Sequence, residues 1–222
     1  MREHYHEQLQ EISADLIEMV KLTESAMERA TRALLNSDLS LAEAVISDDA
    51  RLDLLAQQIE DQCVSIVALQ QPVASELRNL VGALRMSATI ERMGDLAAHI
   101  AKQARLRYPN ASFPTELRST FSMMGALATS GVQKLASVLE TRDLTFAADI
   151  AASDEDMNKM HRELFTTVLS PSWTHGVEAA IDVTLLSRYY ERFADHSVAI
   201  ARRIAYIVTG DLPSKSQLAE NA

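Results

Sequence analysis

The stretch Glu91-Arg92-Met93-Gly94-Asp95 recurs 100 residues later as Glu191-Arg192-Phe193-Ala194-Asp195. Each copy lies in a long segment where apolar residues recur at steps of three and four, the spacing typical of amphipathic helices. The two acids of each copy are four positions apart, so on a helix they share one face and lie one turn apart. Because like charges at this spacing repel each other, the repeated unit indicates two carboxylate pairs that serve a common purpose.

The repetition covers most of the chain. Two apolar stripes, separated by a break at Asn36-Ser37-Asp38, return after 105 residues, and a third stripe, which carries the acid pair, returns after 100. Asp38 is a predicted helix N-cap, and Asp143 occupies the equivalent place in the second half. The fall from 105 to 100 predicts a five-residue deletion in the loop before the last helix, near Pro171-Ser172-Trp173.

The sequence therefore predicts an all-α fold of two tandem, pseudo-symmetric, antiparallel three-helix bundles. The first bundle spans residues 1–108 and the second spans 115–209, and a proline-flanked linker at 109–114 joins them. The expected helices have about 25–33 residues, which is about 40–50 Å at 1.5 Å per residue. Residues 210–222 follow a helix stop and are polar, so they are predicted to form a disordered tail.

Composition excludes several classes of protein. Hydrophobic residues make up 47% of the 222 residues and charged residues 23%, as in an ordinary globular protein, whereas Gly (6) and Pro (5) are too few for a β-sandwich. The net charge of −10 argues against nucleic acid as a partner, because phosphate binding needs a basic face. It is compatible with binding cations or basic protein surfaces.

Compartment can also be inferred from the sequence. The single cysteine, Cys63, cannot form an internal disulfide, which suits a reducing cytoplasm, and its neighbours indicate a core residue rather than a nucleophile. The longest charge-free stretches, such as the one between Phe121 and Lys134, fall short of the roughly 18–20 apolar residues of a membrane span. The polar N-terminus does not resemble a signal peptide. We therefore expect a cytoplasmic protein without a membrane span.

The acids fall on apolar stripes, at positions that packed helices reserve for apolar side chains. The second stripe reads Ala42, Val45, Asp49, Leu52, Ala56, Ile59, Cys63 and Ile66. Its copy reads Ala147, Ile150, Asp154, Met157, His161, Leu164 and Val168. The third stripe reads Leu77, Val81, Leu84, Ala88, Glu91 and Asp95, and its copy includes Val177, Ile181, Glu191 and Asp195. In each half, acids from two helices are thus predicted to turn towards neighbouring helices.

Such carboxylates need cations, because burying several of them together is costly otherwise. Arg92, Arg188 and Arg192 could supply ion pairs, which would make the protein a salt-bridged helical scaffold without metal. Carboxylates without thiolates and with little imidazole also suit Mg²⁺, Mn²⁺ or carboxylate-bridged iron. Arg92 and Arg192 point about 100° away from the preceding Glu on a helix. They are therefore better placed to meet a neighbouring helix, and this favours a metal.

A second motif links the chain to a known family. The junction Leu69-Gln70-Gln71-Pro72-Val73-Ala74-Ser75-Glu76-Leu77-Arg78, the tandem three-helix units and the repeated Glu-Arg-x-x-Asp unit resemble the PhoU family. The resemblance covers residues 1–210 and is strongest to the actinobacterial branch. Members of this family are accessory regulators of the high-affinity phosphate transport system.

The resemblance implies a metal site. In that family the acid-x-x-x-Asp motifs are implicated in binding Mg²⁺ or Mn²⁺ and multinuclear iron or zinc clusters. The matching positions here are Asp49 with Asp53, Glu91 with Asp95, Asp154 with Asn158, and Glu191 with Asp195. Asn158 departs from the acidic pattern, which implies fewer or more weakly bound metal ions in the second half.

The resemblance also implies partners. It indicates a cytoplasmic protein, often a homodimer, that acts as a negative regulator of the phosphate-starvation response when phosphate is plentiful. It is expected to act by contacting the membrane sensor histidine kinase of that response and the ATPase subunit of the phosphate transporter.

Enzymatic alternatives have less support in the sequence. A ferritin-like di-metal oxidase needs Glu-x-x-His motifs on two helices, and the sequence has this spacing only from Glu3 to His6. It has no glycine-rich phosphate loop and no Ser-His-Asp set that spacing can identify. We therefore expect a metal-dependent adaptor rather than an enzyme, with the metal-free scaffold as the second hypothesis.

Overall fold

The structure is a computed structural model that describes the backbone of residues 2–220 and the side chains of residues 7–220. Over this range the chain forms six long helices, one 3-10 turn and one short C-terminal helix, with no strand. These elements are α1 (Arg2–Asn36), α2 (Leu39–Gln70), α3 (Ala74–Arg107), η1 (Thr115–Leu117), α4 (Arg118–Thr141), α5 (Leu144–Val168), α6 (Gly176–Thr209) and α7 (Lys215–Ala219).

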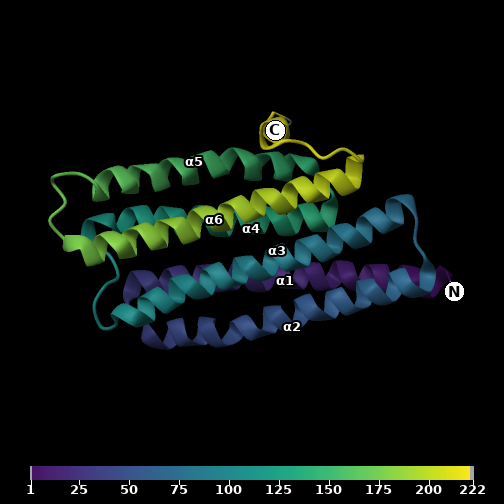
Figure 1. Cartoon of the computed structure of the whole chain (residues 1–222), viewed down its shortest axis with the longest axis horizontal. Coiled ribbons are helices and arrows are strands. Elements are labelled where there is room, and N and C mark those ends of the chain that lie inside the picture. The colour runs from purple at the N-terminus through teal and green to yellow at the C-terminus, as the bar shows by residue number, and fades with distance from the viewer. Residues whose placement is uncertain (1, 221–222) are drawn as a thin grey trace.

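The long helices form two antiparallel bundles. α1, α2 and α3 pack together, and α4, α5 and α6 form a second bundle, which lies above the first in Figure 1. The bundles contact each other through α1 against α4 and α3 against α6. The predicted all-α fold of two tandem three-helix bundles is confirmed. Among the described helices, none combines the length and apolar character that a membrane span requires.

Both predicted N-caps are confirmed. The Asp38 carboxylate accepts a hydrogen bond from the backbone N–H of Leu41 at 3.0 Å, and Asp143 accepts one from Thr145 at 2.9 Å. These bonds satisfy amides that the first turn of a helix leaves without a partner, so each cap fixes where α2 or α5 begins.

The predicted deletion before the last helix lies in a different place. α5 has 25 residues where α2 has 32, whereas the connection to α6, residues 169–175, is longer than the one at residues 71–73. The second half is therefore shortened in the helix and not in the loop. Pro171 explains the early end of α5, because proline cannot continue a helix and disfavours the helical conformation just before it.

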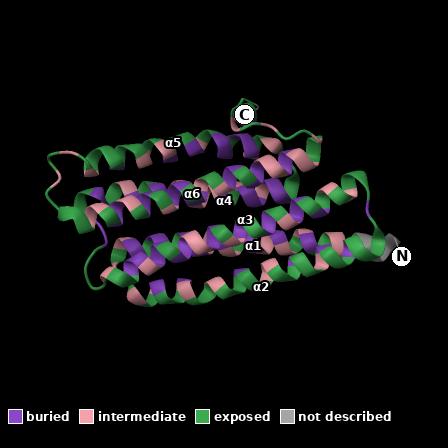
Figure 2. Ribbon diagram, viewed as in Figure 1, coloured by how far each residue is buried: buried purple, intermediate pink, exposed green. Residues whose placement is uncertain are grey.

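Buried residues line the inner faces of both bundles (Figure 2). Between the bundles, Thr31 on α1 and Tyr190 on α6 share a buried hydrogen bond of 2.9 Å. α4 approaches α1 closely at Gly125, where a Cβ atom would lie 2.3 Å from Thr31 Cγ2. At the end of α3, the Arg107 guanidinium donates to both carboxylate oxygens of Asp182 on α6, at 2.6 and 3.0 Å. The two halves are thus joined by polar as well as apolar contacts.

The predicted burial pattern is right for α2 and wrong for α3. The apolar members of the α2 stripe are buried from Ala42 to Ile66, except Ala56, which is half-buried. On α3, by contrast, Leu77 and Val81 are each 39% exposed, and the buried stripe is Leu80, Ala83, Ser87, Ile90, Gly94, Ala97 and Ala101. The acid pair of α3 therefore lies on an outer apolar stripe and not in the core. α6 repeats the error, with Val177 and Ile181 exposed.

The segment that was predicted to be a disordered tail is partly helical in the structure. Residues 215–219 form α7, which begins with a capping box between Ser214 and Gln217 and buries Leu218. α7 packs against α5 and places Lys215 beside the acids of the second half. Residues 221 and 222 of the predicted tail lie outside the described residues.

Candidate metal and ion-pair sites of the two halves

The first half brings four carboxylates together at the contact between α2 and α3. Asp49 and Asp53 come from α2, and Glu91 and Asp95 come from α3. Gly94 lets the helices approach each other there, because a Cβ atom at this position would lie 3.1 Å from Asp49 Oδ1 and 2.4 Å from Leu52 Cδ1. Asp49, Glu91 and Asp95 are half-buried and Asp53 is exposed.

These carboxylates repel one another. Burial raises the pKa of Asp49, and the charges of Asp95 and Asp53 raise it further, against a weaker opposing effect of Lys102 and His99. Burial, Asp95 and Asp53 likewise raise the pKa of Glu91. None of the four forms an ion pair with a described side chain. The first half therefore holds an acidic cluster in which no carboxylate pairs directly with a described cation, although Lys102 and His99 lie near Asp49.

The donor set fits a hard divalent cation, since it consists of carboxylate oxygens alone. The side chains are not arranged around such an ion, because no three His, Cys, Asp or Glu residues with described side chains converge closely enough to hold a metal. Asp53 is exposed and the other three are half-buried at the surface, so a change of side-chain rotamer could bring their oxygens together.

Repulsion in this cluster predicts a pH effect on stability without metal. Because the folded-state pKa of Glu91 lies above its ordinary value, the folded protein is favoured at low pH, and this contribution is lost as pH rises through the raised pKa. Replacing Glu91 with Gln should therefore raise the melting temperature in EDTA at pH 7.5 and leave it nearly unchanged at pH 4. Thermal melts of both proteins check this, and equal melting temperatures at pH 7.5 would contradict it.

In the second half, a lysine of the same chain neutralises Asp154, the counterpart of Asp49. The side chain of Asp154 on α5 is 1% exposed and forms an ion pair with the ammonium group of Lys215 on α7. Asn158 Nδ2 donates a hydrogen bond to the same carboxylate oxygen at 2.9 Å. The other oxygen, Oδ1, is buried and has no hydrogen-bond partner among the described residues.

Glu191 is neutralised by the residue three positions before it. The Arg188 guanidinium donates to both of its carboxylate oxygens at 2.6 Å. Glu191 is only 8% exposed, and burial and the charge of Asp195 raise its pKa although Arg188 and Arg192 lower it. Arg188 thus pairs with an acid of its own helix and does not link two helices, and the metal-ligand roles of Asp154, Asn158, Glu191 and Asp195 stay predictions.

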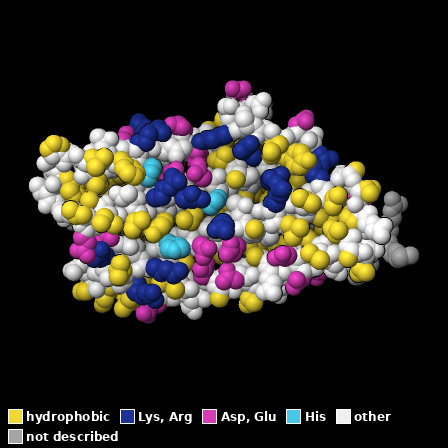
Figure 3. All heavy atoms as spheres, in the orientation of Figure 1, with side chains coloured by type: hydrophobic (Ala, Val, Ile, Leu, Met, Phe, Trp, Pro, Cys, Tyr) yellow, Lys and Arg dark blue, Asp and Glu magenta, His cyan; other side chains and the backbone are white. Residues whose placement is uncertain are grey.

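Arg92 and Arg192 do not form the predicted ion pairs. Both side chains are exposed, and neither pairs with an acid within the described part of the chain. They lie instead near His196, whose pKa is lowered by burial and then by the charges of Arg192 and Arg92. One arginine from α3 and one from α6 therefore lie near the same histidine, together with Asp195. Figure 3 shows this face, with charged side chains gathered in the middle and hydrophobic side chains towards both ends.

Lys215 is the residue that the sequence interpretation missed. It lies 61 positions from Asp154, in a segment expected to be disordered. A sequence signal was present, because Ser214 and Gln217 have the spacing of a capping box and stand before Leu218. The Glu3 to His6 spacing considered for an oxidase lies outside the described side chains.

Comparison with known families and sequences identifies close relatives. Residues 16–104 and 121–204 each match the PhoU domain. The chain is 48% identical over 213 residues to the phosphate-specific transport system accessory protein PhoU homolog 2 of Mycobacterium tuberculosis, which covers 96% of this chain and all of that protein. It is 46% identical over 213 residues to PhoU homolog 1 of Mycobacterium leprae, covering 96% of each chain.

Solved structures agree with these relatives. The phosphate transport system regulatory protein PhoU from Streptococcus pneumoniae superposes with a TM-score of 0.85 at 25% identity, over 95% of this chain and 99% of that one. PhoU from Pseudomonas aeruginosa shares the fold with a TM-score of 0.82, over 93% of this chain and all of that one. The similarity thus includes both bundles.

Proposed function

The chain belongs to the PhoU family, and from this membership we propose that it regulates phosphate homeostasis as an accessory protein of a high-affinity phosphate transporter. The mycobacterial relatives carry this description, and the similarity extends over 96% of the chain. One PhoU domain match lies in each of the two bundles, and the structural similarity extends over 95% of this chain, so both halves support the assignment.

On this proposal the protein works in the cytoplasm as an adaptor and not as a catalyst. It represses the phosphate-starvation response by contacting the membrane sensor histidine kinase and the ATPase subunit of the transporter, and it assembles as a homodimer. The net charge of −10 favours basic partner surfaces. Exposed Leu77, Val81, Val177 and Ile181 offer apolar contact area beside the charged residues of α3 and α6.

We further propose that a divalent cation binds Asp49, Asp53, Glu91 and Asp95, with Mg²⁺ and Mn²⁺ preferred and iron and zinc as the other candidates. The observation that supports this is the lack of a paired cation at these four carboxylates in the described structure, whereas Lys215 and Arg188 neutralise Asp154 and Glu191. A bound cation would offset the repulsion and fix α2 against α3. The second half fits the salt-bridged hypothesis instead.

Repression can be tested in cells. In a strain that lacks its own copy, wild-type protein should restore low activity of a phosphate-starvation promoter in phosphate-rich medium. The double variant Glu91→Gln, Asp95→Asn should restore it poorly, because the cation site is lost. A matched variant, Glu43→Gln with Asp61→Asn, removes two exposed acids of α2 and should act like wild type.

The two parts of the proposal fail in different ways. High promoter activity in the presence of wild-type protein would contradict repression. Full repression by the double variant Glu91→Gln, Asp95→Asn would be consistent with the proposed regulatory role but would show that repression does not require the metal site.

A further inference from the structure

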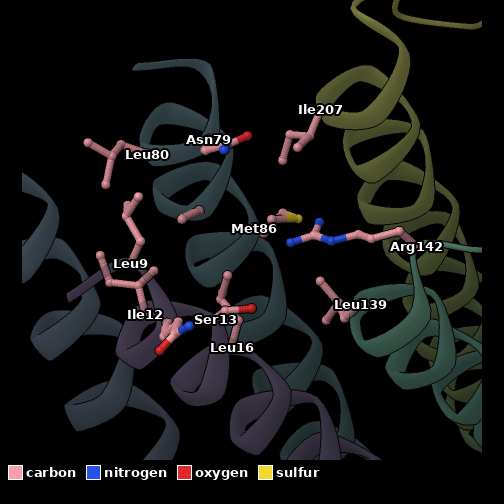
Figure 4. Close-up of a pocket in the computed structure, with 12 residues that line it drawn as sticks. Leu9, Ile12, Ser13, Leu16, Asn79, Leu80, Met86, Leu139, Arg142 and Ile207 are labelled. Carbon is pink, nitrogen blue, oxygen red and sulfur yellow. The ribbon is translucent and has the colours of Figure 1, made fainter. Parts of the chain in front are cut away.

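A cavity of about 340 Å³ opens at the end of the bundle where α1 and α3 begin and α4 and α6 end (Figure 4). Its walls come from both halves of the protein. Leu9, Ile12 and Leu16 line it from α1, Leu80 and Met86 from α3, and Leu139 and Ile207 from α4 and α6. The volume lies within the range of small-molecule sites, and the lining is mainly aliphatic.

One cation extends into this cavity. In Figure 4 the guanidinium of Arg142 points across the cavity towards Met86, away from the turn between α4 and α5. Arg142 as a whole is exposed at that turn. Its guanidinium is partly desolvated, and this desolvation lowers the pKa of Arg142. No hydrogen bond or ion pair of this guanidinium occurs with any side chain from residue 7 to residue 220.

The turn does not explain why arginine stands at this position. Arg142 ends α4 with φ of 61°, in the left-handed region. Glycine or asparagine adopts that conformation at lower cost, and helices most often end with one of them. The residue therefore keeps a long cationic side chain at a position whose backbone favours a small one.

The opposite end of the pseudo-symmetric fold shows how the equivalent place is closed. There Phe121, the counterpart of Leu16, is covered by Phe113 with ring centroids 4.7 Å apart. Arg107, the counterpart of Ile207, is neutralised by Asp182 and Glu178. One end thus has stacked aromatic rings and a cation that pairs with two acids, whereas the other has an open, mainly apolar cavity and a cation that pairs with no described side chain.

We propose that this cavity binds an amphipathic carboxylate, a molecule with one carboxylate and an aliphatic chain. The carboxylate pairs with Arg142, and the chain packs against the leucine, isoleucine and methionine side chains of the walls. A planar guanidinium matches a carboxylate with two parallel hydrogen bonds. One guanidinium also balances one negative charge, so a carboxylate fits better than the dianion of a phosphate monoester.

Isothermal titration of the full chain with decanoate tests the proposal, with decanol as the uncharged probe of equal chain length. We expect one saturable site that binds decanoate about tenfold more tightly than decanol, the effect of one charge-assisted hydrogen-bonded pair. Arg142→Gln should weaken decanoate about tenfold and leave decanol unchanged. Arg105→Gln, which removes an exposed cation of α3 that forms no ion pair with a described side chain, should bind like wild type.

A second variant tests the location. Ser13 lines the cavity and is half-buried, so Ser13→Phe should fill the space and abolish binding of both probes. Ala14→Phe adds the same ring at the next, exposed position of α1 and should bind like wild type. Circular dichroism reports whether each variant is folded, and Arg142→Gln decides the question if Ser13→Phe is not.

Three results with the decanoate and decanol probes would overturn the proposal. In the first, decanoate shows no saturable binding. In the second, Arg142→Gln binds decanoate as tightly as wild type does. In the third, wild type binds decanol as tightly as decanoate. Competition of inorganic phosphate with decanoate at similar concentrations would also overturn it, because the site would then recognise small anions without a chain.

Discussion

Replacement of Lys215 by methionine should lower the free energy of unfolding by about 3 kcal/mol at pH 7, at the low end of the range for breaking a buried ion pair because Lys215 is itself 39% exposed. The variant leaves the Asp154 carboxylate buried with one remaining donor, the amide of Asn158. It also removes the charge that holds α7 against α5. Urea denaturation measures the loss.

Two further variants isolate the ion pair. Asp154→Asn combined with Lys215→Met should be more stable than Lys215→Met alone, because the buried charge is removed together with its partner. Lys159→Met removes an exposed lysine of α5 that forms no ion pair with a described residue, and it should stay within about 0.5 kcal/mol of wild type. A Lys215→Met variant as stable as Lys159→Met would show that Lys215 does not neutralise Asp154.

Loading the metal-free protein with Mn²⁺ should raise its stability through the first half alone. At a free metal concentration of 100 times Kd, a ligand that binds only the folded state adds about 2.7 kcal/mol. For a chain of this size that corresponds to a rise of about 5–10 °C in melting temperature. Thermal melts in EDTA and in Mn²⁺, with elemental analysis of the loaded protein, measure the effect.

The pseudo-symmetry supplies the control for this experiment. Glu91→Gln with Asp95→Asn should abolish the rise, whereas Glu191→Gln with Asp195→Asn should keep it. Loss of the rise in both double variants would mean that the halves bind metal together. Identical melts of wild type with and without Mn²⁺ would support the metal-free scaffold.

Most of the fold could be predicted because the sequence holds two copies of each helix, and the pattern of one copy can be checked against the other. The α2 stripe from Ala42 to Ile66 and the caps at Asp38 and Asp143 followed from spacing alone. The burial of α3 and α6 did not, because these two helices, unlike α2, also pack against each other across the contact between the bundles. On α3 the closest contacts fall on small residues such as Gly82 and Gly94, whereas the sequence interpretation assigned the larger aliphatic residues to the core.

The acidic cluster of the first half could also be predicted from the spacing of its residues. The acids of α2 and α3 share a register, and the structure brings them together as expected. Lys215 could not be paired with Asp154 from spacing, since the contact is long-range and depends on how α7 folds back. Of the three predicted arginines, Arg188 pairs with a described acid, and it does so within its own helix because it lies three residues before Glu191 on the same face.

Asn158 is the place where the two copies disagree, and the structure gives a reason. Its amide donates to Asp154, which the carboxylate of the counterpart Asp53 could not do for Asp49 when ionised. Together with Lys215, Asn158 satisfies one oxygen of a buried carboxylate. The duplicated site has thus diverged in its source of positive charge, with internal cations in one half and a proposed metal in the other.

A crystal structure of the Mn²⁺-loaded protein, with anomalous scattering recorded for manganese, tests this divergence most directly. An anomalous peak is expected between α2 and α3, within coordination distance of carboxylates of the set Asp49, Asp53, Glu91 and Asp95, and no peak is expected beside Asp154. A protein without a peak in the first half, or with equal peaks in both halves, would contradict this expectation.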